Sequence, residues 1–521
     1  MKIAVVGAGP SGLYFAVLMA RSGGHDVTVF ERNPRGATYG WGVVFSEGTL
    51  TELAEVDYLT YLDLERSLVH WSAIDIRRPD STIRSYGHGF SAISRHTLLR
   101  VLEDRAEELG VTLKFDIEIG AGDLGPSDLG PSDRGTGDVG DFDLVVAADG
   151  VNSGLRLHHQ NSFQPTVHPH PTRYVWLGAP FAFDAFTFIF APTPAGLFQA
   201  HAYPYDEHGS TFIVETTEET WRRSGMDEAG EDESAAFCAK LFADHLDGSP
   251  LRSNRSQWNR FITLSNRHWY LLEPENPPLV LIGDAAHTAH FSIGSGTKLA
   301  MEDAAGLYQA LNARPESIRS ALAIYEAERQ PAVARFQEAA RDSARYFESV
   351  ERHLQLQPAT FAFNLLTRSG RMTHLDMERR DPALTIAADR VIAGVEHGEV
   401  VPPPSQTALM LGGLTLPNRL VADFDGSAGE GLLLTPTIAV DQIGRSHPGS
   451  PVIGPGAARY SRKQGAAIAL VIGHAGARAA TRPPEDGLDR QLRVGGWEAV
   501  ACSPIPYTRH IGFRGRCRRT T

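Results

Sequence analysis

The chain has 521 residues and a formal net charge of −13, and 42% of its residues are hydrophobic while 21% are charged. This composition is that of a globular protein with about two to four domains, and its acidic balance argues against nucleic-acid binding. No stretch approaches the roughly 18 apolar residues of a membrane-spanning helix. Three cysteines without metal-site or redox spacing fit a reduced, cytoplasmic protein with no metal site.

The first 31 residues predict a dinucleotide-binding βαβ unit. An apolar strand over residues 2–6 leads into a G-x-G-x-x-G turn, a helix follows to about residue 21, and a second strand over 27–30 ends at Glu31. A glycine-rich turn between strand and helix is typical of a pyrophosphate site, and the acid can accept ribose hydroxyls. The pattern fits NAD and FAD equally well, and a merely tight turn is the alternative.

Each residue of the turn has its own expected role. Gly7 makes the tight turn, Gly9 lets the backbone approach a pyrophosphate, and Gly12 lets the helix pack closely on the strand. Pro10 and Ser11 begin the helix, whose first N–H groups attract an anion.

The residues after Glu31 include further candidate contacts with such a ligand. Arg32 begins a turn, and the run Trp41-Gly42-Val43 suits a backbone segment that lies close to a flat ligand, with a plain glycine loop as the alternative. Arg95 lies in the first turn of a predicted helix, where a cation is unfavourable to the helix dipole. We therefore expect an anionic partner for Arg95, either the ligand or a neighbouring carboxylate.

Two further strands end in acids. The strand over 142–148 is followed by Asp149-Gly150, and the aliphatic strand over 279–282 is followed by Gly283-Asp284. Ligands of open α/β sheets dock at the carboxyl ends of parallel strands, so both turns are candidate ligand contacts.

A second helix N-terminus is predicted shortly after the last of these turns. A loop with Ile293 and Gly294 leads into a helix that begins near Gly296 and carries Thr297 and Lys298 in its first turn. Such an end, preceded by glycines, is expected to contact an anion or a polar ring.

The sequence changes character between residues 173 and 215. Segments rich in β-formers over 186–190, 197–203 and 211–215 are broken by proline and glycine. This pattern predicts an antiparallel sheet inserted into the α/β domain, and one face of it could wall a substrate pocket.

Three signatures, Gly7 to Gly12 with Glu31, Asp149-Gly150 and Gly283-Asp284, occur in an order and spacing that resembles the single-component FAD aromatic hydroxylases of the para-hydroxybenzoate hydroxylase type. The resemblance covers about residues 1–375. It implies an α/β fold, a doubly wound FAD-binding Rossmann-type domain with an inserted antiparallel substrate sheet. In that family the first motif binds the ADP half of FAD, the Asp-Gly turn serves FAD and the nicotinamide donor, and the Gly-Asp turn holds the ribityl chain.

Shorter segments are similar to one subgroup of that family. The run from Gly40 to Val44, the strands around His201 and Glu215, and the run from His290 to Gly294 look like the salicylyl-CoA and anthraniloyl-CoA hydroxylases, and also like the violacein-pathway indole hydroxylases. Phe291 stands where the wider family usually has a proline, and this departure belongs to the subgroup.

The resemblance divides the chain into a monooxygenase, a linker and a remnant. The monooxygenase spans 1–375, with FAD-binding parts at about 1–70, 90–160 and 275–375 and the substrate sheet at about 70–90 and 165–275. Residues 376–405 are the predicted linker, and residues 406–521 resemble pieces of an old-yellow-enzyme-like FMN barrel. Because such a barrel needs ~250 residues, we predict a truncated, incomplete barrel-like segment without FMN, which could serve in packing or in a homodimer.

The implied activity is hydroxylation of an electron-rich aromatic ring. FAD is the implied bound cofactor, NAD(P)H and O₂ are co-substrates, and a flavin C4a-hydroperoxide supplies the oxygen. The implied substrate is an aryl-CoA thioester such as salicylyl- or anthraniloyl-CoA, or alternatively an indole or another aryl natural-product intermediate. A non-catalytic flavoprotein and an FAD-dependent halogenase are alternatives from other classes, although Trp41-Gly42-Val43 does not match the W-x-W-x-I run of the halogenases.

A base close to the ring substituent would assist the reaction by withdrawing a proton. The candidates are His201 on the substrate sheet and His290 beside the flavin loop, and packing is the alternative role for each. Lys298 could meet the pyrimidine edge of the flavin or a substrate anion.

Overall fold

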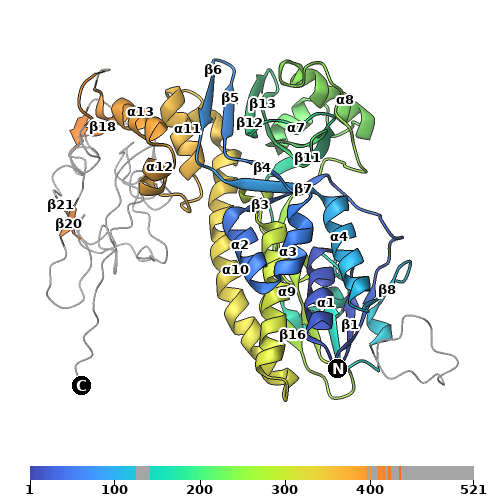
Figure 1. Ribbon diagram of the computed structural model, residues 1–521. Helices are drawn as coiled ribbons and strands as arrows, with labels where there is room; N and C mark the ends of the chain where they lie inside the picture. The colour runs from blue at the N-terminus through green and yellow to red at the C-terminus, as the bar shows by residue number, and fades with distance from the viewer. Residues whose placement is uncertain are drawn as a thin grey trace. The chain divides into compact units, whose positions relative to one another are not determined.

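The computed structural model describes residues 1–124, 141–395 and 398–401, together with the backbone of four short strands between 409 and 435. The chain forms two compact units, Met1–Glu351 and Arg352–Thr521. Four helices run beside the first sheet of the first unit (Figure 1), namely α1 (Pro10–Ser22), α4 (Arg95–Glu108), α9 (Gly296–Ala313) and α10 (Ile318–Glu348). No helix in the described part of the chain is long and apolar enough to cross a membrane.

The first sheet has six strands in the order β16-β17-β9-β1-β2-β8. Their bounds are Tyr270–Leu271 (β16), Leu279–Leu281 (β17), Leu144–Ala147 (β9), Lys2–Val6 (β1), Asp26–Phe30 (β2) and Thr112–Lys114 (β8). All neighbours pair in parallel except β16 with β17. Strands β9 and β17 are fully buried, as their aliphatic runs predict. The predicted α/β fold around a parallel sheet is thereby confirmed.

The second sheet has the order β11-β14-β13-β12-β5-β6. Its strands are Thr172–Ala179 (β11), Ser210–Thr217 (β14), Gly196–Pro204 (β13), Phe186–Thr193 (β12), Ile74–Arg78 (β5) and Ser81–Ser85 (β6). Pairing is antiparallel except between β12 and β5. We call it the substrate sheet, and Figure 1 shows it at the end of the first unit that is remote from the N-terminus.

The two faces of the substrate sheet differ in chemistry. One face packs Val175, Phe198 and Phe212 against Cys238 and Phe242, at and just after helix α8 (Glu231–Leu241). Because side chains alternate along a strand, the opposite face carries the residues between these apolar positions. That opposite face is the one from which the site described below is built.

Smaller elements complete the first unit. A three-stranded sheet joins β3 (Gly42–Ser46), β7 (Phe90–Ser94) and β4 (Val69–Trp71), and β10 (Pro165–Pro169) pairs with β15 (Ile262–Asn266). The remaining helices are α2 (Glu47–Val56), α3 (Tyr58–Glu65), α5 (Gly154–His158), α6 (Gln160–Phe163) and α7 (Glu218–Arg223). Short 3₁₀ turns lie at Ala121–Asp123, Ala243–His245, Gly283–Ala285, Phe291–Ile293 and Val350–His353.

The second unit corrects the predicted linker over 376–405. Helices α11 (Pro358–Thr367), α12 (His374–Arg380) and α13 (Pro382–Ala393) occupy the chain up to residue 393. Thr373 and Asp376 form a capping box at the start of α12, and Asp381 caps α13 ahead of Pro382. Side-chain caps and a proline in the first turn stabilise helix starts, so local signals for these helices were present in the sequence.

The predicted barrel-like segment is not confirmed. The described strands of that region, Leu409–Leu411 (β18), Leu414–Leu416 (β19), Val421–Asp423 (β20) and Leu433–Thr435 (β21), pair as two antiparallel hairpins. Core strands of an eight-stranded α/β barrel are parallel instead. The rest of the proposed remnant over 406–521 lies outside the described residues.

Candidate functional site

Three turns predicted to contact the cofactor meet at one edge of the parallel sheet. Gly7, Asp149 and Gly283 follow the neighbouring strands β1, β9 and β17. A Cβ atom on Gly7 would lie 2.4 Å from the carbonyl oxygen of Ala148, and one on Gly283 would lie 2.6 Å from Oγ of Ser11. Both glycines also have positive φ angles, of 108° and 60°, so only glycine allows the turns to approach so closely.

The N-terminus of α1 is open to an anion. Gly9 is the N-cap residue, neither a side-chain cap nor an acidic residue occupies the first turn, and Pro10 begins the helix. A Cβ on Gly9 would meet nothing within 4 Å, whereas a Cβ on Gly12 would lie 2.1 Å from the carbonyl oxygen of Gly7. Open space in front of unpaired N–H groups fits the pyrophosphate of a dinucleotide.

Glu31 closes the end of β2 and shapes the neighbouring loop. One carboxylate oxygen accepts the backbone N–H of Ala8 at 2.9 Å, and the other accepts the backbone N–H of Asn33 at 2.9 Å. Arg32 is exposed beside it. A cavity of about 280 Å³ lies between the following loop and α4, and it is lined by Arg35, Gly36, Thr38, His96, Leu99, Arg100, Glu103 and Asp104.

The turn at Asp149 and Gly150 carries an unsatisfied polar atom. Oδ1 of Asp149 is buried without a hydrogen-bond partner, and burial raises the pKa of its carboxyl. Arg156, which the sequence analysis did not single out as a site residue, donates to the carbonyl oxygen of Ala285 at 3.0 Å and to that of Val151 at 2.5 Å. It thereby ties this turn to the one after β17, and a hydroxyl-bearing ligand would satisfy Asp149.

Asp284 has the properties of a residue at the bottom of an open cleft. Solvent reaches its side chain, yet the protein packed around it raises the pKa of its carboxyl by desolvation. Burial likewise lowers the pKa of Arg95, and the charge of Asp284 partly offsets this effect. The backbone N–H of Arg95 donates to the carbonyl oxygen of Trp41 at 2.7 Å, so three predicted contacts lie in one place.

Asp303 on α9 holds the turn after β17, and the sequence analysis missed this role. Its carboxylate accepts the backbone N–H of Gly283 at 3.1 Å, lies 2.6 Å from Nε2 of His287, and accepts Nε of Arg329 at 2.9 Å. Desolvation would raise the pKa of Asp303, but His287 and Arg329 together hold it below its usual value. Helix α9 is therefore bonded directly to the Gly-Asp turn.

The start of α9 lies beside the Gly40–Val44 segment. Gly294 has a φ of 61°, and a Cβ there would lie 3.8 Å from a methyl carbon of Val44. After Ile293 and Gly294, α9 begins at Gly296 and Thr297 with neither a side-chain cap nor an acid in its first turn. Its N–H groups are thus available to a polar ring edge.

The ammonium of Lys298 is directed elsewhere. It lies 3.0 Å from the carboxylate of Glu52 on α2 and also pairs with Glu302. The structure therefore does not leave this charge facing the turns that carry the other predicted contacts.

The Trp41-Gly42-Val43 segment is fastened to the substrate sheet. The N–H of Gly42 donates to Oγ1 of Thr211 at 2.8 Å, and the hydroxyl of Tyr203 donates to the carbonyl oxygen of Gly42 at 3.0 Å. Trp41 stacks on Tyr205 with ring centroids 6.4 Å apart, while Val43 is buried. This contact joins the dinucleotide domain to the second sheet.

Both candidate histidines flank one buried carboxylate on the face of the substrate sheet away from α8. Glu215 is 0% exposed, and its carboxylate lies 3.6 Å from Nε2 of His201 and 3.7 Å from Nε2 of His290. It also accepts the hydroxyl of Thr172 at 2.7 Å and the amide of Gln199 at 3.1 Å. Although burial alone would raise it, these neighbours hold the pKa of Glu215 below its usual value.

Glu215 was missed as a site residue, although its sequence carried a signal. A glutamate at the end of the run Phe212-Ile213-Val214 is unusual for a strand that is otherwise apolar, because a buried charge needs partners. Those partners come from three other segments, which a reading of the strand alone does not reveal.

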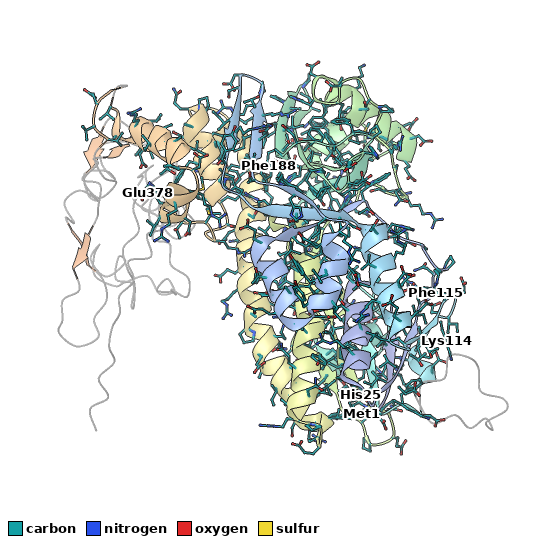
Figure 2. The ribbon with its side chains drawn as sticks, viewed as in Figure 1. Met1, His25, Lys114, Phe115, Phe188 and Glu378 are labelled. Atoms are coloured by element: carbon teal, nitrogen blue, oxygen red, sulfur yellow. The ribbon has the colours of Figure 1, made fainter. Side chains whose placement is uncertain are left out.

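Aromatic rings surround His201. Phe188, labelled in Figure 2, lies with its ring centroid 5.2 Å from that of His201, and the rings of Phe291 and Phe347 lie 5.8 Å and 4.7 Å away. These apolar neighbours keep water from the histidine and could flank a flat aromatic substrate. Within residues 1–124, 141–395 and 398–401, no group of His, Cys, Asp or Glu side chains is suited to hold a metal ion.

The chain is similar to characterised flavin enzymes. Residues 1–340 match the family described as FAD binding domain. Salicyloyl-CoA 5-hydroxylase of a Streptomyces species is 38% identical, and the match covers 84% of this chain and 82% of that enzyme. The 3-hydroxy-4-methyl-anthranilyl-[aryl-carrier protein] 5-monooxygenase of Streptosporangium sibiricum is 37% identical over 72% of this chain and 97% of the relative.

A third enzyme and a solved structure are also similar to this chain. Protodeoxyviolaceinate monooxygenase of Chromobacterium violaceum is 32% identical, with 69% of this chain and 92% of that enzyme covered. The tetrameric 2-methyl-3-hydroxypyridine-5-carboxylic acid oxygenase shares the fold, with a TM-score of 0.54 and 20% identity over 73% of this chain and 97% of that one. The chain therefore belongs to the FAD-binding-domain family, and it is a flavin-dependent aromatic monooxygenase that uses FAD with NAD(P)H and O₂.

Proposed function

We propose that the enzyme hydroxylates the ring of an aryl thioester that carries a hydroxyl or amino group. Two of its relatives are named for a salicyloyl-CoA and for an anthranilyl group on a carrier protein, and both rings have such an electron-donating substituent. The balanced reaction is Ar–H + O₂ + NAD(P)H + H⁺ → Ar–OH + H₂O + NAD(P)⁺. Bound FAD supplies the oxygen-transfer chemistry, while the protein binds, orients and excludes water.

The proposed cofactor contacts follow from the geometry of the turns. The first turn of α1 binds the pyrophosphate, Glu31 and Arg32 lie at the ribose, and Asp149 and Asp284 accept hydroxyl groups. The Trp41–Val43 segment and the residues from Ile293 to Thr297 contact the flavin ring, with Arg95 at the same cleft. An orphaned Asp149 oxygen and open space before Gly9 support this assignment.

One observation carries the proposal for the substrate. The face of the substrate sheet away from α8 brings His201 and Glu215 close to His290, which precedes the flavin loop. Three aromatic rings surround His201: Phe188 of the sheet, Phe291 of the loop and Phe347 of α10. Aromatic walls suit a flat ring, and an imidazole beside it can take the proton of a ring hydroxyl.

The test is a substrate panel with purified full-length protein. NADH and NADPH oxidation and the mass of the product would be followed with salicyloyl-CoA, anthraniloyl-CoA, their free acids and indole. We expect hydroxylated thioester with salicyloyl- or anthraniloyl-CoA and little product from the free acids. If indole is the only arene that gives product, the substrate belongs instead to the indole class of the violacein relative. If none of the arenes gives product, the proposal is contradicted.

The C-terminal region adds a separate proposal. We propose that residues 406–521 bind no FMN and serve in packing or in a homodimer. Flavin released by denaturation should be FAD alone, at about one per chain, and light scattering should give the mass of a dimer. Stoichiometric FMN would overturn the first part, and a monomer would exclude the homodimer and leave packing as the role of the segment.

A further inference from the structure

The buried carboxylate of Glu215 lies where the two large sheets meet, and such a position calls for a physical explanation. Glu215 comes from β14 of the substrate sheet, whereas His290 comes from the loop between β17 and α9 of the other sheet. Burying a carboxylate away from water costs free energy, and hydrogen-bond donors or cations around it must offset that cost. Two of the side chains closest to Glu215 are histidines, at 3.6 Å and 3.7 Å, which makes the cluster able to bind a proton as well as to pack.

The hydrogen bonds distinguish the two histidines. Nδ1 of His290 accepts the backbone N–H of Ser292 at 3.3 Å and lies 2.9 Å from its hydroxyl. Nε2 of His290 is the atom that faces Glu215, at 3.7 Å. His290 is held by the loop before α9, while His201 lies on the substrate sheet among the rings of Phe188, Phe291 and Phe347.

Other titratable groups near the cluster are few. Tyr174 on β11 pairs across from Glu215, and burial together with Asp284 raises its pKa. His170, just before β11, lies with its ring centroid 4.8 Å from that of His290 and its Nδ1 3.4 Å from Glu348 on α10. Strands β11 to β14 place no lysine or arginine on this face, whereas β5 of the same sheet places Arg78 there, in an ion pair with Asp80.

We propose that Glu215 is a positioning residue for the hydroxylation, which orients His201 and stabilises the imidazolium that forms when His201 takes the proton of the substrate's ring hydroxyl. This inference rests on the proposed function, because it assumes a ring with a hydroxyl substituent. The O–H bond of the substituent breaks, a new N–H bond forms on His201, and the electron pair stays on the oxygen. That pair enters the ring and makes it a better nucleophile for oxygen transfer.

The charges remain paired throughout this step. Before it, Glu215 is a carboxylate that accepts hydrogen bonds from Thr172 and Gln199 and lies 3.6 Å and 3.7 Å from the two histidines. After it, one imidazolium lies between that carboxylate and the newly anionic substituent. A second fixed cation is not needed, in agreement with the absence of lysine and arginine from this face of strands β11 to β14. His290 and Thr172 keep Glu215 in place.

The test compares Glu215→Gln with wild type, using salicyloyl-CoA and FAD-loaded protein. We expect native FAD content, about 100-fold slower product formation at pH 7, and continued NAD(P)H oxidation that releases H₂O₂ instead of product. The rate should rise at a higher pH than in wild type, where the ring hydroxyl ionises unaided. A ring-fluorinated salicyloyl-CoA, whose hydroxyl ionises at lower pH, should recover most of the lost rate.

Two further variants make the result specific. Glu219→Gln, an exposed glutamate that pairs only with Arg223 among the described residues, is the control for loss of one charge and should behave like wild type. His201→Asn should lose as much activity as Glu215→Gln, and the double variant should lose no more than either. If Glu215→Gln does not fold, His201→Asn alone still tests the inference, because a rate within twofold of wild type would overturn the role of His201 as the base.

The outcomes separate the inference from the proposed function. Wild type that fails to hydroxylate any arene contradicts both, whereas an active wild type upholds the function. If Glu215→Gln then keeps its rate within twofold with an unchanged pH profile, Glu215 has no part in proton transfer. A slow variant that fluorination does not rescue would also overturn the inference, because it would show a packing role alone.

Discussion

The carboxylate of Asp303 accepts the backbone N–H of Gly283 at 3.1 Å across 20 positions of sequence. Helix α9 thereby fixes the turn that presents Asp284 to the cofactor cleft. The same carboxylate lies on His287 and Arg329, so a single side chain joins three segments of the dinucleotide domain.

Asp303→Asn should destabilise the protein strongly. The amide cannot neutralise Arg329, whose mostly buried guanidinium keeps Glu302 as its carboxylate partner. Breaking one partner of a buried pair therefore costs up to about 3–5 kcal/mol. Urea unfolding at pH 7 would measure the loss. Asp342→Asn, on the more exposed surface of α10, is the control, and equal midpoints for the two variants would contradict the role of Asp303.

Two glycine substitutions should separate cofactor binding from folding. Gly9→Ala has room for its Cβ and a φ of −76°, so it should fold normally yet bind FAD about 10-fold more weakly, because the methyl group occupies the approach to the pyrophosphate. Gly12→Ala places its Cβ 2.1 Å from a backbone oxygen and should lose about 1–3 kcal/mol of stability. Equilibrium dialysis and thermal melts check both, and an unchanged FAD affinity in Gly9→Ala would count against the assigned site.

Asp284→Asn should stabilise the cofactor-free protein while weakening FAD binding. Desolvation raises the folded-state pKa of Asp284, so its ionised form opposes folding at every pH above that value. The variant should gain at most about 1 kcal/mol at pH 7, because solvent screens the exposed carboxylate, and the gain should fade as the pH falls through the raised folded-state pKa and wild type becomes protonated. Denaturation of cofactor-free protein between pH 4 and 7 gives the difference, and a loss of stability at pH 7 would refute the sign.

Glu218 should stabilise the folded protein at neutral pH, and this stabilisation should be lost in acid, which is the opposite of the effect expected for Asp284. Hydrogen bonding by Arg173, helped by Arg260, lowers its pKa to about 2. This contribution is complete above the unfolded-state value of about 4.3 and disappears as the pH falls from there towards 2. Glu218→Gln should cost no more than about 1 kcal/mol at pH 7, since the pairs lie near the surface. The difference in urea midpoint between Glu218→Gln and wild type should disappear as the pH is lowered.

Local patterns explain why the dinucleotide site was predictable. The glycine turn, Asp149-Gly150 and Gly283-Asp284 each sit directly after an aliphatic strand, and parallel pairing of β1, β9 and β17 then brings the turns together. The antiparallel substrate sheet was predictable for the same reason, because alternation and breakers mark its strands. The helices at 374–393 were missed although their caps are local signals.

Residues whose roles depend on distant partners were not predictable. Nothing in the sequence near Lys298 identifies the partner of its ammonium group. Only the fold brings Glu52, 246 positions away, into contact with it. Asp303 and Glu215 are likewise acids whose partners come from other segments of the chain. Their burial, more than their residue type, makes them important, and burial follows from tertiary packing.

The parallel pairing of β1, β9 and β17 also sets the order of events during synthesis. The strand that carries Gly283 lies far along the chain from the strand that carries Gly7, and contacts of such separation form late in folding. A nascent chain that ends before residue 279 lacks one of the three turns and should not retain FAD. Cofactor capture is therefore a late step, and free FAD in a refolding mixture should act on the yield of finished protein rather than on the rate of the first collapse.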